Sequence, residues 1–211
     1  WSACLVSFLL GIASKENAVL LPLSLALAEM VFFRHERLQR PPRRSMLGLA
    51  VSAVSVIGLA GVFFFTKGDP LSLLNYDSRY FSPWERLLTQ PRVLMLYLSQ
   101  LFYPVPLRLS IEHDIALSTS VLHPWSTLPS ILAVFLLITL AIKKQRSWPY
   151  LSFAVLFFFL NHLIESSIIP LELVFEHRNY IPSMFLFVPV ASGLCAMLDY
   201  CRRHRRRMHP V

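Results

Sequence analysis

Six apolar stretches, most of them near the length of a membrane-spanning helix, constrain this chain more than any other feature. An α-helix needs about 20 apolar residues to cross the hydrocarbon core of a bilayer. The composition agrees, because 55% of the 211 residues are hydrophobic, 15% are charged and the mean hydropathy is +0.54. We therefore expect an all-α fold, a polytopic transmembrane bundle of about six spans that forms one integral membrane domain over 1–211. The expected spans lie near residues 1–13, 18–33, 46–66, 122–142, 148–164 and 184–200.

The first apolar stretch begins at Trp1, with no initiator Met and no charged segment before it. A signal peptide would carry such a charged segment, so we expect this stretch to be a span and the chain to be a fragment of a longer protein. The three cysteines, Cys4, Cys195 and Cys201, fall in or beside apolar stretches, which predicts ordinary apolar thiols and no disulfide framework.

Three clusters of basic residues predict the orientation, because cytoplasmic loops collect Lys and Arg. All three fall on one side if 67–121 crosses the membrane an even number of times. The loops 67–121 and 165–183 are then extracytoplasmic, as expected for an integral protein of a bacterial inner membrane. Basic residues beside a span anchor it to anionic lipid, so we expect membrane lipid and no nucleic acid as a partner. The clusters are Arg34, Arg37, Arg40, Arg43 and Arg44; Lys143, Lys144 and Arg146; and Arg202, Arg203, Arg205, Arg206 and Arg207.

Residues 93–107 form a shorter apolar stretch between Arg92 and Arg108, with two prolines near its end. A single crossing there would place one basic cluster outside the cell. We therefore predict an interfacial or re-entrant helix near 91–109, on the outer face.

The loop 165–183 concentrates ionisable residues at a membrane edge, where they are costly unless paired or in contact with water. Arg178 can bind a phosphate with its planar fork, Glu176 can orient it, and His177 and Tyr180 add polar groups. The structural alternative is a Glu176–Arg178 pair that closes a helix hairpin. The sequence contains no glycine-rich phosphate loop, HExxH or GxSxG motif, so nucleotide-dependent and classical hydrolase chemistry have no support.

Two other outer segments are candidate sites. Lys15, with Glu16 beside it, lies in a polar turn between two apolar stretches. Its ammonium group is a point charge suited to binding a phosphate. The alternative is a simple hairpin turn in which Lys15 pairs with Glu16 and extends to water. Glu112, His113 and Asp114 could hold a divalent cation or act as acid and base, or form a solvated loop. No other cofactor is expected.

Three motifs together resemble one family. They are Ser-Lys-Glu between two spans, SPWERLLTQPRVLMLYLSQLFYPVPLRLSIEHD over 82–114, and FEHRNYIPS over 175–183. In this order they resemble the membrane part of the transmembrane-and-tetratricopeptide-repeat O-mannosyltransferase-like proteins and their bacterial relatives, within the C-type superfamily of glycosyltransferases. The resemblance implies transfer of a sugar from a polyprenyl-phosphate carrier to a protein or glycan acceptor on the extracytoplasmic face.

The resemblance also implies roles for individual residues. Lys15 and Arg178, supported by His177 and Tyr180, would bind the carrier phosphate, and grooves between spans would hold the isoprenoid tail. Glu112, His113 and Asp114 would shape the sugar site.

The chain departs from this family in two ways. The family's acidic catalytic residue lies in its first outer loop, which has no counterpart here, so the catalytic residue stays unassigned. The tetratricopeptide repeats are also missing, and no 34-residue repeat occurs. We therefore expect the C-terminal half of a membrane domain, inactive by itself. Two alternatives stay open: a non-catalytic membrane scaffold or transporter subunit, and an envelope glycan ligase or polymerase.

Overall fold

The computed structural model describes residues 2–33, 75–77, 79–106 and 115–208, and every regular element among them is a helix. The all-α fold class is therefore confirmed for this part of the chain. The predicted span 46–66 lies outside the described residues. The elements, in chain order, are α1 Ser2–Ser14, η1 Glu16–Leu20, α2 Leu21–Phe32, α5 Pro83–Phe102, α6 Thr127–Lys144, α7 Pro149–Asn161, η4 Glu176–Asn179, α8 Tyr180–Ser183 and α9 Phe187–Met208.

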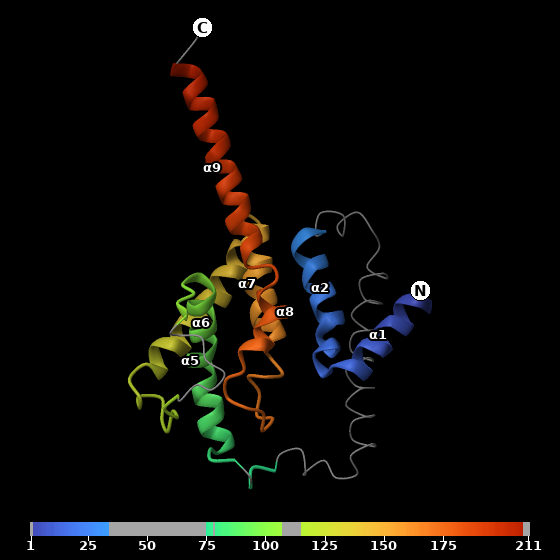
Figure 1. Ribbon diagram of the computed structural model, residues 1–211, viewed down its shortest axis with the longest axis vertical. Helices are drawn as coiled ribbons and strands as arrows, with labels where there is room; N and C mark the ends of the chain where they lie inside the picture. Colours follow the sequence, from blue (N-terminus) through green and yellow to red (C-terminus); the bar gives the residue numbers. More distant parts are fainter. Residues whose placement is uncertain (1, 34–74, 78, 107–114, 209–211) are drawn as a thin grey trace.

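Helix α7 is the centre of the packing, and it is apolar all round because other helices cover it on several sides. Phe153 and Phe157 pack against Val31 of α2. Phe158 is fully buried and packs with Val93 of α5 in a second apolar cluster. Figure 1 accordingly shows α7 between α2 and the α5–α6 pair, while α9 extends away from the other helices.

One described helix, α6, is by itself long and apolar enough to cross a bilayer. The segments Glu176–Ser183 and Phe187–His204 qualify only as a pair, and they are bent by 52° relative to each other. The stretch Asn17–Phe32 and α7 are apolar but shorter than a full span. The described residues thus show one helix that could cross a membrane, or two if the bent pair forms one span, and they do not show a six-span bundle.

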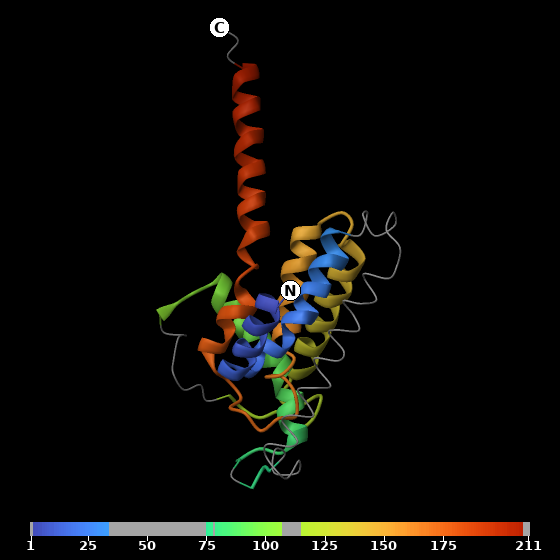
Figure 2. The same cartoon turned by 90° about the vertical axis from the view of Figure 1, so that its right-hand side faces the viewer.

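Different segments of the chain lie at the two ends of the helical assembly. The C-terminal end of α2, the turn between α6 and α7, and the free end of α9 all lie toward the top of Figures 1 and 2. The beginning of α5 and the loop that follows α7 lie toward the bottom. Lys143 and Lys144 close α6, so basic residues mark the upper end.

Helix α5 does not have the predicted bounds of 91–109, because it begins at Pro83 and ends at Phe102. A capping box explains the early start: the Ser82 hydroxyl accepts from the backbone N–H of Glu85, and the Glu85 carboxylate accepts from that of Ser82. Pro91 is accommodated inside the helix.

The predicted spans 122–142 and 184–200, in contrast to α5, begin later than expected, at Thr127 and Phe187. Residues before Thr127 form a hydrogen-bonded turn around Pro124. The bend after Ser183 separates the short helix α8 from α9, so Pro182 lies before the bend and not in the first turn of the last helix.

Candidate functional site

One buried arginine of α5 sets the path of the segment that follows α7. Arg86 is 0% exposed. Its Nε donates to the carbonyl oxygen of Ser167 at 3.0 Å, and its Nη2 donates to that of Glu165 at 2.6 Å. Its Nη1 donates to the carbonyl oxygen of Leu171. The guanidinium carries its donors in a rigid planar fork, so three bonds to one side chain fold this segment into a defined loop.

Three further polar side chains of α5 extend this contact along the helix. Gln90 donates to a carbonyl oxygen of the loop. The Tyr97 hydroxyl accepts a hydrogen bond of 2.7 Å from the backbone N–H of Phe175. Gln100 donates to the Glu176 carboxylate at 2.7 Å. These positions recur at helical spacing, so they form a polar stripe on one face of α5 that holds the loop and η4.

Glu165, the first charged residue after α7, is 8% exposed and connects this loop to the start of the chain. Asn17 donates to its Oε1 at 3.0 Å. Burial raises the pKa of the Glu165 carboxyl above its ordinary value of 4.5, and the bond from Asn17 opposes that shift. The positive charges of Arg178, Lys15 and His177 also lower this pKa. Lys15 and Arg178, from opposite ends of the sequence, therefore lie within electrostatic reach of one carboxylate.

An aromatic ring orients Arg178. Its guanidinium carbon lies 4.9 Å from the centre of the Phe175 ring, within the range of a cation–π contact. The His177 ring meets the same Phe175 edge-on, with centroids 4.3 Å apart. Because Tyr97 of α5 holds the backbone of Phe175, the stripe on α5 also positions Arg178.

A small polar cavity lies beside Glu165 and Arg178. Its volume of about 10 Å³ is close to the space of one water molecule. His162, 1% exposed, has its Nδ1 2.9 Å from the carbonyl oxygen of Phe158, so Nδ1 carries the proton and Nε2 is an acceptor. Among the described residues, His162 Nε2 and the Ser166 hydroxyl have no hydrogen-bond partner. The residues that line the cavity are Gln90, Tyr97, His162, Glu165, Ser166, Glu172, Leu173, Phe175 and Arg178.

The other predicted site residues have different positions. His177 is exposed, although it contributes to the field at Glu165. Tyr180 is 80% exposed and does not line the cavity. Glu176 faces Gln100. The side chain of Glu16 and the whole of Glu112, His113 and Asp114 lie outside the described part of the chain. Across the described ranges, no three His, Cys, Asp or Glu side chains form a group that could hold a metal ion.

Sequence reasoning did not select Arg86, Tyr97, His162 and Asn17. One signal was available for the first two: Arg86, Gln90, Tyr97 and Gln100 interrupt a largely apolar helix at spacings that bring them to one face. His162 carried no such signal, because a single histidine at the end of an apolar stretch is usually a core residue.

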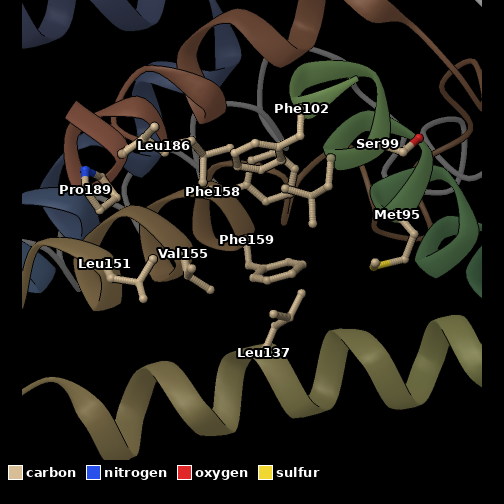
Figure 3. A pocket seen from close by; sticks show the side chains of 12 residues that line it. Met95, Ser99, Phe102, Leu137, Leu151, Val155, Phe158, Phe159, Leu186 and Pro189 are labelled. Atoms are coloured by element: carbon tan, nitrogen blue, oxygen red, sulfur yellow. The ribbon is translucent and has the colours of Figure 1, made fainter. Parts of the chain in front are cut away.

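An apolar groove of about 630 Å³ lies next to the polar cavity. Figure 3 shows Leu137 of α6, Met95 and Phe102 of α5, and Phe159 of α7 around the same space. The two hollows share a wall, because Phe158 lines the groove and its ring centroid lies 4.4 Å from that of His162, which lines the cavity. The volume is that of a lipid- or ligand-sized site.

Comparison with models of known protein families, with curated proteins and with solved structures finds no match for this chain.

Proposed function

We propose that this chain is the part of a membrane glycosyltransferase that binds a polyprenyl-phosphate sugar donor at the extracytoplasmic face. The carrier phosphate would bind between Lys15 and Arg178, and the prenyl tail would enter the apolar groove. The observation that carries the proposal is the approach of these two cations to one carboxylate, Glu165, beside a groove of about 630 Å³. A ligand with an anionic head and an apolar tail matches both parts.

The proposal includes a membrane orientation. The turn after α6 and the free end of α9 would face the cytoplasm, because basic residues gather there. The loop held by Arg86 would face the opposite side, at the end of the assembly where α5 begins. The six-span bundle belongs to this proposal, with 46–66 as one of its spans.

The reaction would be a displacement at the anomeric carbon of the donor sugar. A bond forms from the acceptor hydroxyl oxygen to this carbon, the bond from the carbon to the phosphate oxygen breaks, and its electron pair stays on the phosphate. The proton of the hydroxyl goes to a carboxylate general base, which the family resemblance puts in a first outer loop. Lys15 and Arg178 would stabilise the charge that develops on the leaving phosphate.

Binding of a prenyl phosphodiester to the chain in nanodiscs tests the proposal. Leu137→Trp fills the groove and should weaken binding at least about tenfold, since it removes the space for the tail. Leu136→Trp is the matched control, because the neighbouring Leu136 is 56% exposed and does not line the groove. Lys15→Ala with Arg178→Ala should abolish binding of the phosphate. Equal affinity in wild type and this double variant would refute the phosphate site.

A further inference from the structure

Glu165 is fixed from two sides beside the proposed phosphate position. Its backbone carbonyl accepts from Arg86 of α5, and its side chain accepts from Asn17, which follows the Lys15 turn. A carboxylate offers about four acceptor positions. Within the described residues, Asn17 is its one side-chain hydrogen-bond partner, and Glu165 lines the small cavity together with Arg178.

The charged and polar groups around Glu165 come from several elements. Lys15 approaches from the turn before η1, and Arg178 and His177 approach from η4. Tyr97 of α5, His162 at the end of α7, and Glu172 of the loop line the same cavity. In the ligand-free protein the Glu165 carboxylate therefore supplies the negative charge near Lys15 and Arg178. In the complex a bound phosphate would supply it.

We propose that Glu165 is the internal counter-ion of Lys15 and Arg178, and that a phosphate binds between these cations together with one proton that neutralises Glu165. The inference rests on the proposed function and adds a regulatory property to the same site. One proton is taken up from solvent for each phosphate bound, and no covalent bond changes.

The environment of Glu165 favours this exchange. Its carboxyl is buried and makes no direct ion pair among the described residues, so burial outweighs the nearby positive charges and raises its pKa. A bound phosphate would add a negative charge and raise this pKa further. By linkage, a condition that favours protonation of Glu165 also favours binding of the phosphate, and binding of the phosphate favours protonation by the same factor.

The test measures affinity for a prenyl phosphodiester against pH, in nanodiscs, because a phosphodiester keeps one constant charge between about pH 5 and pH 8. Wild type should bind about tenfold more tightly at the lower pH, the effect of removing one nearby like charge. Glu165→Gln keeps the acceptor for Asn17 and cannot ionise. This variant should bind with nearly the same high affinity at both pH values.

Two control variants make the result specific. His177→Asn removes the exposed histidine whose charge acts on Glu165 and should leave the pH dependence in place. Glu172→Gln neutralises a second carboxylate of the loop, which pairs with Arg79, and should also keep the pH dependence. Soluble inorganic phosphate as a competitor separates recognition of the head group from binding of the tail.

The outcomes separate the two proposals. If Lys15→Ala with Arg178→Ala lowers affinity, but Glu165→Gln binds no more tightly than wild type at the higher pH, the counter-ion role is wrong and the phosphate site stands. Wild-type affinity that does not change with pH also overturns the counter-ion role. If the double variant binds as well as wild type, the phosphate site itself is refuted.

Discussion

The side-chain amide of Asn17 donates a hydrogen bond of 3.0 Å to the carboxylate of Glu165 and joins the turn between α1 and α2 to the loop after α7. Arg86 holds the backbone of the same Glu165 from the other side. Arg86, which lies on α5 and in neither of these segments, thus helps to determine where Lys15 and Arg178 can approach each other. The arrangement of the candidate site depends on this small polar network and not on the apolar helices alone.

Arg86→Lys should destabilise the protein. A lysine keeps the charge but cannot donate to three carbonyl oxygens from one planar group, so buried carbonyls lose partners. We expect a loss of about 3 kcal/mol in the free energy of unfolding, measured by thermal unfolding in detergent. Arg92→Lys is the control, because Arg92 lies on the same helix, is only half-buried and contacts a different segment. Equal stability of Arg86→Lys and wild type would contradict the role of Arg86.

The sequence was sufficient to predict the all-α fold, because apolar composition in long stretches leaves few other solutions. It also contained the start of α5, since Ser82, Pro83 and Glu85 form a recognisable capping box. The predicted bounds were wrong because they followed hydropathy alone, and the first turns of α5 are polar.

The partners of the polar side chains could not be predicted. Arg86 and its carbonyl acceptors are about 80 positions apart, and Asn17 and Glu165 are 148 apart. No local pattern in a single sequence encodes which distant segment covers a helix face. The loop 165–183 was identified because charge at a membrane edge is costly, whereas the cavity beside it depends on that distant pairing.

The stability of the protein should fall as pH rises from about 4.5, through the contribution of Glu165. Its pKa is raised in the folded state, so over this range the unfolded chain has lost the proton while the folded one still holds it. Glu165→Gln removes this contribution. The difference in melting temperature, Glu165→Gln minus wild type, should therefore increase with pH and level off above the raised pKa. A difference that falls or stays constant over this range would show that burial does not control this carboxyl.

Membrane orientation can be tested with single cysteines in a background from which the exposed Cys4, Cys195 and Cys201 are removed. Tyr180→Cys marks the loop side, and Lys144→Cys marks the turn after α6; both positions are exposed. A membrane-impermeant thiol reagent should label intact cells at position 180 and not at 144. Labelling at 144 alone would reverse the orientation, and labelling at both would mean that α7 does not separate two compartments.

Arg178→Lys separates donor binding from a structural role. Lysine keeps the charge but loses the planar fork and the contact of the guanidinium with Phe175. If Arg178 binds the donor phosphate, affinity for a prenyl phosphodiester should fall about tenfold, while membrane abundance and melting temperature stay near those of wild type. Arg79→Lys is the control, since Arg79 pairs with Glu172 on the same loop and has no proposed contact with the donor.

The structural alternative makes a different prediction for a double change. If Arg178 serves only to neutralise Glu176, Arg178→Ala should lower folded yield by leaving a carboxylate without its cation, and adding Glu176→Gln should restore both yield and affinity. If Arg178 binds the donor, the second change cannot replace the lost fork, so affinity stays low even where yield recovers. Glu176 already accepts from Gln100, and a glutamine at 176 can keep that bond, so the double variant should fold. Restored affinity in the double variant would therefore exclude Arg178 from the donor site.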